Sequence, residues 1–414
     1  MKRTLLIANG CFSDIEANGR TLKMLFKGAE PDKLAQFYTY GTPDYDFCRH
    51  YYQVSDGTAL RSIKPGFNYD GKQDERPAQG GQEAGQAPAA VVNHSGKTPF
   101  KMCLRELAWK LGHWDNANLW QWVQDFNPEL IVLFVANNTF TVRLAIEVAK
   151  RYRLPIIVYS TEGYCFMDFN YFTWRPSLWY GVFYRGLNKA LDQLTPYVSE
   201  GFFNIPLLAA EYRERFGYNT HTIMNSSTMT FMDKTDIGQP PRLVYTGNLG
   251  NNRHLALMEI GKELSDMGLN VDVYGPPATE ADEEELRKAP GINFHGFVSY
   301  DTVQQVTREA DLLIHVEYDD DRTNRYFKYA FSTKIADSIC SGTPLLVYGN
   351  AEFAFMKFLK EQGCAFVVSD RQELNQALNK ALNDKFERAQ VIACALRTKR
   401  EYLTGNKEFF ERLE

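Results

Sequence analysis

Short apolar runs alternate with amphipathic stretches along most of the chain, and this alternation predicts a doubly wound α/β fold. Unbroken runs of Leu, Ile and Val are typical of strands that are buried on both faces of a parallel sheet. In the first half, the apolar positions predict strands at residues 4–8, 37–40, 130–135, 155–159, 192–199 and 223–226. Between them they predict helices at residues 19–27, 98–111, 119–126, 140–152 and 206–216.

One of these helices begins at Thr98-Pro99, since Thr caps a helix and Pro fits its first turn. Its apolar positions lie on one face of the helix, at Phe100, Leu104, Leu107 and Leu111. The residues just before it, 65–97, are rich in Gly, Gln, Ala and Pro and cannot bury a core face. They predict a mobile loop within the first domain.

The same alternation resumes at Leu243 and predicts a second α/β domain. Its predicted strands are residues 243–247, 271–275, 292–298, 312–316, 345–349 and 365–368, with helices at 253–267, 279–288, 301–309, 352–362, 371–383 and 385–403. We therefore predict domains at residues 1–226 and 242–385, joined by a polar, proline-containing linker at 227–241. Ligands of such sheets bind beyond the carboxyl ends of the strands.

Residues 326–350 contain the strongest local signal for a ligand. Ser332 and Thr333 begin a predicted helix that Gly342 ends, and the backbone N–H groups at such a helix start suit a phosphate. Lys334 adds a positive charge, and Asp337 lies one turn further on, where it could accept a hydrogen bond from a sugar hydroxyl. An ordinary Ser-Thr-capped helix explains these residues equally well.

Composition narrows the class of protein. The net charge of −5 and the pI of about 5.9 argue against a nucleic-acid-binding protein, which usually has a basic surplus. The seven scattered cysteines fit free thiols in a reducing cytoplasm, and no His/Cys cluster has the spacing of a zinc site. The first residues predict a strand rather than a signal peptide, because Asn9-Gly10 interrupts the apolar run. No stretch approaches the length of a membrane-spanning helix.

Four blocks in the second half carry a resemblance to a known family. They are YTGNLG followed by Arg253, INFHGFVSYDTV, ADLLIHVE and FSTKIADSICSGTPLLV, in that order. Together they resemble the donor-binding half of retaining GT-B glycosyltransferases, and the nearest type is glycosyltransferase family four. The resemblance implies two Rossmann-like domains facing a cleft, with a nucleotide-diphosphate sugar as substrate on the second domain and the acceptor on the first. It implies no cofactor. It also implies that the terminal segment, 386–414, crosses back to the first domain.

The resemblance assigns residues to the donor. Arg253 and Lys334 match the family's diphosphate-binding cations, and Asp337 falls where the family's second glutamate binds the ribose. The donor site would also include Gly247, Asn248, Phe297, Ser332 and Thr333. On the acceptor side, the resemblance points to Asn18 and Gly19 in the loop after the first strand.

Two positions depart from the family pattern. Tyr329 stands where the family's first glutamate contacts the donor sugar, although branches with an S-[TK]-K loop also lack that glutamate. In the first domain, Thr161-Glu162 occupies the place of a frequent histidine, so Glu162 is the candidate polar group near the reacting carbon. A helix cap or a surface carboxylate is the competing interpretation of Glu162.

The resemblance implies transfer of a sugar with retention of configuration to a glycan or lipid-linked acceptor, in bacterial surface polysaccharide synthesis. We predict a metal-independent enzyme, in which cations and helix N–H groups stabilise the departing diphosphate. The acidic run 319–321 is interpreted as a solvated loop rather than a metal site, and no two acids stand out as the carboxylate pair of a glycoside hydrolase. Alternatives are a GT-B nucleotide-sugar epimerase, a phosphorylase, or a non-catalytic GT-B module that binds sugar nucleotides.

The segment 171–185 is rich in aromatic and basic residues. Trp174, Trp179, Phe183 and Tyr184, with Arg175 and Arg185, would suit a membrane surface and a lipid-linked acceptor. An aromatic internal face of the first domain is the competing interpretation. The expected location is therefore cytoplasmic, either free or peripheral on the inner face of the membrane.

Overall fold

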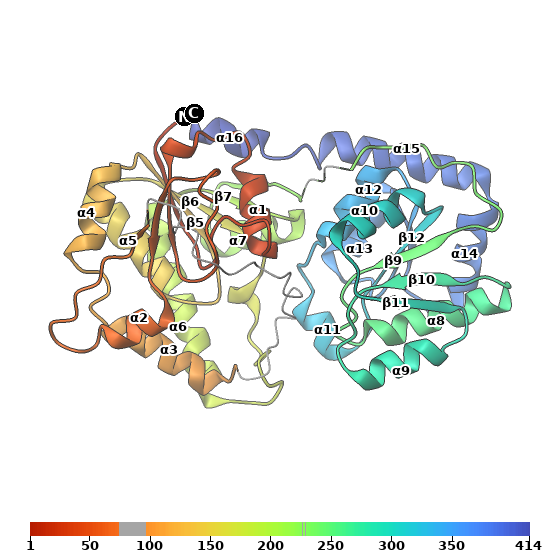
Figure 1. Ribbon diagram of the computed structural model, residues 1–414, viewed down its shortest axis with the longest axis horizontal. Helices are drawn as coiled ribbons and strands as arrows, with labels where there is room; N and C mark the ends of the chain where they lie inside the picture. Colours follow the sequence, from red (N-terminus) through yellow and green to blue (C-terminus); the bar gives the residue numbers. More distant parts are fainter. Residues whose placement is uncertain (74–96, 226, 228) are drawn as a thin grey trace, which may run out of the picture. The chain divides into compact units, whose positions relative to one another are not determined.

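A computed structural model describes residues 1–73, 97–225, 227 and 229–414. It divides into an N-terminal unit, Met1–Ile223 with Asn406–Glu414, and a C-terminal unit, Met224–Gly405. The predicted mobile loop at 65–97 lies mostly outside the described residues. Each unit contains one sheet (Figure 1), as the alternating pattern predicts.

The sheet of the N-terminal unit has the order β4-β3-β2-β1-β5-β6-β7-β8 among the described residues. All neighbours pair in parallel except β3 and β4. The strands are β1 (Thr4–Ile7), β2 (Leu34–Tyr38), β3 (His50–Gln53), β4 (Lys72–Gln73), β5 (Leu130–Phe134), β6 (Ile156–Ser160), β7 (Val198–Phe203) and β8 (Thr220–Thr222). Strands β1, β2, β5 and β6 are buried along their whole length, which explains their unbroken apolar runs.

Helices cover both faces of this sheet. They are α1 (Ala17–Leu25), α2 (Asp56–Arg61), α3 (Pro99–Leu111), α4 (Ala117–Phe126), α5 (Phe140–Tyr152), α6 (Leu178–Leu194), α7 (Pro206–Phe216) and α16 (Lys407–Leu413). Helix α16 brings Phe409 and Leu413 into the core that α1 forms with the sheet. The two ends of the chain consequently lie side by side (Figure 1), and the backbone N–H of Lys2 donates to the carbonyl of Leu413.

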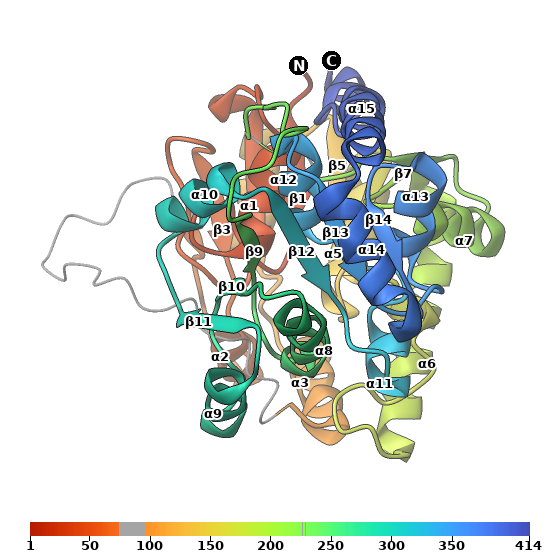
Figure 2. The same ribbon diagram turned by 90° about the vertical axis from the view of Figure 1, so that its right-hand side faces the viewer.

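The sheet of the C-terminal unit has the order β11-β10-β9-β12-β13-β14 and is parallel throughout the described residues. Its strands are β9 (Leu243–Thr246), β10 (Val271–Tyr274), β11 (Ile292–Gly296), β12 (Leu312–Val316), β13 (Leu345–Tyr348) and β14 (Phe366–Val368). Its helices are α8 (Arg253–Asp266), α9 (Glu280–Lys288), α10 (Tyr300–Glu309), α11 (Asp321–Tyr326), α12 (Thr333–Ser341), α13 (Ala354–Gln362), α14 (Leu374–Asn383) and α15 (Lys385–Glu401). Helices α8, α9 and α14 pack on one face (Figure 2), and right-handed crossovers put α10, α12 and α13 on the other.

The structure differs from the sequence pattern in the aromatic segment. Helix α6 occupies residues for which the pattern predicts no helix, because large aromatic and apolar side chains fall on several of its faces and hide the helical period. Its buried positions are Tyr180, Phe183, Leu187, Ala190, Leu191 and Leu194. The strand predicted at 192–199 begins only at Val198, and the strand predicted at 223–226 lies at β8 instead.

The residues predicted as a linker, 227–241, are part of the C-terminal unit. Arg388 in α15 is fully buried, and its guanidinium donates to the carbonyls of Thr235, at 3.2 Å, and Lys234. Helix α15 itself contacts α12, α13 and α14. Residues 386–405 therefore belong to the C-terminal unit, and only Asn406–Glu414 belong to the N-terminal one.

Helix α3 forms where the sequence predicts it, with Thr98 as its cap. Its apolar stripe, however, is exposed rather than packed on the core: Phe100, Leu104, Leu107 and Leu111 are 46 to 52% exposed. The helix is held by its other side, where Met102 and Trp109 are buried and Trp109 Nε1 donates to Asp56 Oδ1 at 2.7 Å. Among the described residues, the stripe thus stays largely exposed, and its Phe100 meets the ring of Trp179 on α6.

Candidate functional site

The strand order of the C-terminal unit reverses between β9 and β12. From this pair the chain winds outward in both directions, to β10 and β11 on one side and to β13 and β14 on the other. In an open parallel sheet, the loops diverge at such a point and leave a crevice beyond the carboxyl ends of the two strands. Residues 247–252 and 317–320 form the two loops here.

Arg253 stands at this position as the first residue of α8. Its guanidinium makes a two-pronged ion pair with Glu317, with Nε to Oε2 at 2.9 Å and Nη2 to Oε1 at 2.7 Å, and Nη1 donates to the carbonyl of Asn248 at 3.3 Å. Burial is the largest influence and opposes its charge, but the charge of Glu317, the interaction with Tyr245 and the hydrogen bond to Glu317 together raise the pKa of Arg253. These contacts fix the direction of the guanidinium before any ligand arrives.

Lys334 is the second residue of α12. Its side chain enters the same crevice as Arg253 from the β12 side. Its Nζ atom lies 2.7 Å from the position that a Cβ atom on Gly247 would occupy. Burial, and then the positive charge of Arg253, lower the pKa of Lys334 to about 8. The structure therefore brings Arg253, Lys334 and Gly247 together at the reversal of strand order, and only a residue without a side chain leaves room for the ammonium group.

The other predicted donor residues lie around these two cations. Ser332 caps α12, its Oγ accepting from Lys334 N at 3.2 Å, and Thr333 is exposed beside it. Asp337 accepts a hydrogen bond from Ser227 Oγ. Tyr329 is buried, and Lys328 Nζ donates to its Oη at 2.9 Å.

Two further predicted donor residues follow strands of the same sheet. The side chain of Asn248 accepts from the N–H of Gly250 at 2.6 Å, so it shapes its own loop. Phe297 is 59% exposed and follows β11, two strands away from β9. Phe297 therefore lies at the same edge of the sheet as the cations but not beside them.

Sequence reasoning missed Glu317 and His315. Both are buried at the carboxyl end of β12, and His315 Nε2 has no hydrogen-bond partner among the described residues. Burial, followed by the charges of Arg253 and Lys334, keeps the pKa of His315 well below its usual value, so this imidazole is neutral. The available signal was a charged residue placed directly after the apolar run LLIHV.

The acidic run 319–321 is engaged in local structure. Asp320 caps α11 by accepting from Arg322 N and Thr323 N at 2.9 and 3.0 Å, and Asp319 accepts from Asn324 Nδ2 at 2.6 Å. Within the ranges that the structure describes, no group of three or more His, Cys, Asp or Glu side chains is arranged to hold a metal ion.

In the N-terminal unit, the strand order reverses between β1 and β5. Asn138, after β5, bridges the two loops by donating to Asn9 Oδ1 at 3.2 Å. Beside it, Glu106 of α3 accepts from the backbone N–H of Thr139 at 3.1 Å, and burial raises the pKa of this carboxyl group. The sequence prediction missed Asn9, Asn138 and Glu106.

Asn18 and Gly19, predicted on the acceptor side, lie in the first turn of α1 at this same edge. Asn18 is exposed, whereas Gly19 is buried, and a Cβ atom on Gly19 would lie 2.7 Å from the carbonyl oxygen of Cys11. Gly19 therefore allows α1 to pack closely against the loop after β1. Gly19 thus has a packing role in the structure, whereas the side chain of Asn18 is exposed to solvent.

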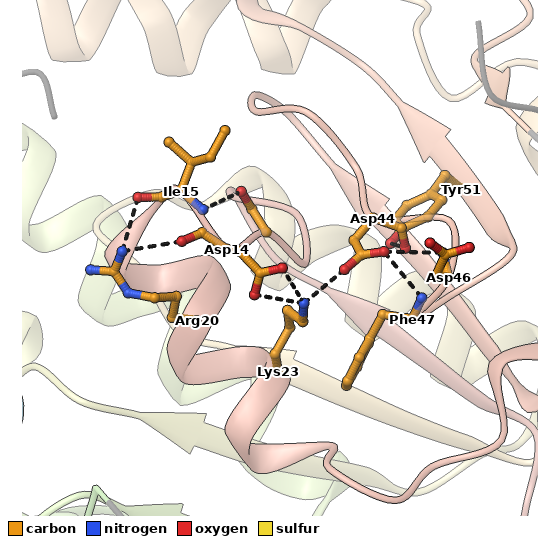
Figure 3. A network of polar contacts seen from close by, with 9 residues as sticks. Asp14, Ile15, Arg20, Lys23, Asp44, Asp46, Phe47 and Tyr51 are labelled. Carbon is orange, nitrogen blue, oxygen red and sulfur yellow. Dashed lines mark hydrogen bonds and ion pairs between the residues drawn. The ribbon is translucent and has the colours of Figure 1, made fainter. Parts of the chain in front are cut away.

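A polar network holds that loop in place (Figure 3). Lys23 Nζ lies 2.6 Å from Asp14 Oδ1 and 2.7 Å from Asp44 Oδ2. Arg20 donates to the carbonyls of Asp14 and Ile15 at 3.2 and 3.1 Å. The loop after β1 is thereby tied to α1 and to the loop after β2, which gives the N-terminal edge a defined shape.

Glu162 follows β6, one strand further from the reversal point. It is half-buried, and burial raises its pKa to about 7. Its backbone carbonyl accepts from Ser160 Oγ at 2.9 Å. A carboxyl group with such a pKa is divided between its acid and its base form near neutrality, and this distinguishes it from an ordinary surface carboxylate.

Comparison with known proteins shows the fold. No family model matches the chain, and no curated protein matches it. Among solved structures, HepE from Anabaena, in complex with UDP and with UDP and glucose, gives a TM-score of 0.60 at 12% identity, covering 100% of this chain and 99% of that one. Sucrose-phosphate synthase from Thermosynechococcus elongatus gives 0.57 at 10% identity, and MurG from Acinetobacter baumannii gives 0.52 at 10%, each covering 99% of both chains.

These likenesses extend over the whole chain, so both units and their order in the sequence are shared. The prediction of an α/β protein with two Rossmann-like domains of the GT-B fold is thereby confirmed. At such low identity the likeness concerns the fold, and the chemistry has to be argued from the residues of the site.

Proposed function

We propose that this protein is a glycosyltransferase that moves a sugar from a nucleotide-diphosphate sugar to a glycan or lipid-linked acceptor. One observation carries the proposal: Arg253 and Lys334 converge beside Gly247 at the reversal of strand order in the C-terminal sheet. Two cations next to the start of α12 form a site for two phosphoryl groups. The UDP in the HepE structures, which share this fold, makes UDP the first nucleotide to test.

The chemistry follows from where charge develops. When the bond between the sugar and the diphosphate breaks, negative charge grows on the leaving phosphate, and fixed positive groups aimed there lower the barrier. Three of the five N–H groups of Arg253 are used by Glu317 and Asn248, so the guanidinium is held rigidly while its remaining edge serves the phosphate. Lys334 adds a point charge at the second phosphate. Because side chains supply the positive charge, we propose transfer without a metal ion.

The proposal also assigns roles to three further residues. We place Asp337 at the ribose, Glu162 near the reacting carbon and Tyr329 near the donor sugar. Transfer with retention of configuration is supported by the family resemblance of the four sequence blocks. A role in bacterial surface polysaccharide synthesis rests on the same resemblance. The part of the molecule that meets an acceptor would be the N-terminal edge around Asn18 and Asn138.

The test is transfer from UDP-sugars to a panel of glycan and lipid-linked acceptors, in the presence and absence of EDTA. We expect a new glycosidic bond of retained configuration at an equal rate in both conditions. Loss of activity with EDTA, restored by Mn²⁺ or Mg²⁺, would contradict metal independence. Conversion of the UDP-sugar without any acceptor would favour an epimerase, and binding without turnover across the panel would favour a sugar-nucleotide-binding module.

The pKa of Lys334 predicts how donor binding depends on pH. The diphosphate prefers the charged ammonium, and the pKa of about 8 in the free protein means that this charge is lost as the pH rises through 8. We expect the Kd for UDP to be constant from about pH 7 to 8 and then to rise by up to about tenfold per pH unit, until the pKa of the bound state is reached. Isothermal titration calorimetry at several pH values measures this.

The matched control is Lys334→Arg, whose guanidinium stays charged throughout this range. The variant should bind UDP with the same Kd on both sides of pH 8. A wild-type Kd that does not change up to about pH 9.5 would contradict the expectation that a Lys334 ammonium with a pKa of about 8 contacts the diphosphate.

A further inference from the structure

The N-terminal unit carries an exposed apolar face on two adjacent helices. On α3, the stripe from Phe100 to Leu111 points away from the core. On α6, Leu178 is 91% exposed, and Trp179 and Val182 are about half exposed. The two helices lie against each other (Figure 1), and the rings of Phe100 and Trp179 meet edge to face at 5.0 Å. We call this surface the α3–α6 face.

Most of the charged side chains around the α3–α6 face are basic. Lys101 and Lys110 flank the stripe on α3, since they lie about 80° to 100° around the helix from it on either side. On α6, Arg185 and Lys189 continue the exposed line of Leu178 and Val182. Each of these four basic side chains is exposed.

The two carboxylates of these helices are already engaged. Glu106, the one carboxylate of α3, accepts from Thr139. Asp192, the one carboxylate of α6, lies in the last turn at the far end of the exposed line, where it pairs with Arg215 at 3.7 Å. The face therefore combines an apolar ridge with a positive border.

We propose that the α3–α6 face binds the surface of a membrane that contains anionic phospholipids. A helix with an apolar face and a basic border inserts its apolar side chains among the headgroups, while its cations meet lipid phosphates. A second copy of the chain fits less well. A two-fold interface pairs a patch with itself and would place Lys101, Lys110, Arg185 and Lys189 against like charges.

This surface overlaps only in part with the one that the sequence pattern indicates, since Trp179 and Arg185 belong to both. Of the residues predicted to meet a membrane, Phe183 is buried, and Tyr184 donates its hydroxyl to the carbonyl of Cys165 at 2.8 Å. Trp174 is half-buried and stacks on Phe169 at 5.2 Å. The aromatic part of the segment is therefore mainly internal, and the helix stripe of α3 takes its place beside Trp179.

Membrane docking deepens the proposed function by naming where the acceptor is met: a lipid-linked saccharide held in the same membrane. That statement about the acceptor rests on the proposed transferase activity, but docking itself does not. Among the described residues, every helix falls short of the length and apolar character needed to cross a bilayer. The proposed attachment is correspondingly at the surface.

The test is flotation of the full chain with vesicles of phosphatidylcholine, alone or with about one-third phosphatidylglycerol. We expect the wild type to float with the anionic vesicles at low salt and to be released as salt screens the charges. Leu107→Gln/Leu178→Gln and, separately, Lys101→Glu/Lys110→Glu should each lower the bound fraction about fivefold or more. Because the altered side chains are exposed, each variant is expected to fold normally. Circular dichroism and UDP binding check this.

Phe386→Gln is the matched control, because Phe386 is equally apolar and 78% exposed but lies on α15. It should float like the wild type. Equal flotation of wild type and both double variants overturns the proposal, as does equal binding to neutral vesicles. A wild-type dimer that Leu107→Gln/Leu178→Gln converts to a monomer overturns it as well, because the face would then be an interface between two copies. Vesicle binding is read without any activity, so its failure is distinguishable from failure of the proposed transfer.

Discussion

Replacing Lys334 with Ala should lower the rate of sugar transfer about a hundredfold or more, which is the usual cost of removing one preorganised group that stabilises developing charge. Stability should not fall with it. The folded state holds the pKa of Lys334 at about 8, below the ordinary value of 10.5, so below pH 8 the charged side chain opposes folding. The variant should therefore melt at the same temperature as the wild type or higher. Transfer assays and thermal denaturation, run together, measure both effects.

Arg253 provides the matched comparison. Arg253→Ala should also cost about a hundredfold in transfer, but it leaves Glu317 buried and without its partner, so it should destabilise the protein by about 3–5 kcal/mol. In Arg253→Ala/Glu317→Ala the buried carboxylate is gone, and most of that stability should return while transfer remains lost. Normal turnover in folded Lys334→Ala protein, or in the double variant, would refute the donor site.

The second large effect is expected at Gly275, which lies directly after β10. Its φ is +153°, and a Cβ atom there would lie 1.6 Å from the carbonyl oxygen of Gly247. The clash is with backbone, so no change of rotamer relieves it, and the loop after β9, which Lys334 approaches at Gly247, would have to shift. We expect Gly275→Ala to destabilise the C-terminal unit by about 3 kcal/mol or more and to weaken UDP binding. Urea denaturation and calorimetry measure these two effects.

Gly268→Ala is the control for backbone strain alone. Gly268 also has a left-handed φ, +71°, but no atom lies within 4 Å of the place its Cβ would take. Its substitution should cost about 1 kcal/mol and leave UDP binding unchanged. If the two variants unfold at the same urea concentration, the close approach of Gly275 to Gly247 does not matter for stability.

The sequence predicted the parts of the fold that have strong local signals. The C-terminal strands were predicted well because each is a short apolar run that a polar turn ends, and α12 ends where Gly342 predicts. The pattern failed at α6, where aromatic side chains are both buried and exposed around the helix. It also gave no means to distinguish the two sides of α3, because burial there depends on Asp56, a partner distant in the sequence.

The candidate site was likewise predicted where local motifs exist and missed where distant residues meet. Arg253 and Lys334 were found through motifs, and their proximity then followed from the strand order around β9 and β12. Glu317 and His315 were missed, since a carboxylate and an imidazole at the end of one strand acquire meaning only when α8 and α12 bring cations to them. Residue type can be predicted from a pattern, but a pairing between separate loops requires the fold.

The return of α16 to the first sheet affects how the protein is made. Phe409 and Leu413 fill the same core as β1 and α1, although about four hundred residues separate them in the chain. On the ribosome, the early strands can pair as they emerge, but that core stays incomplete until the whole C-terminal unit has been translated. We infer that the half of the molecule synthesised first is the half that finishes folding last.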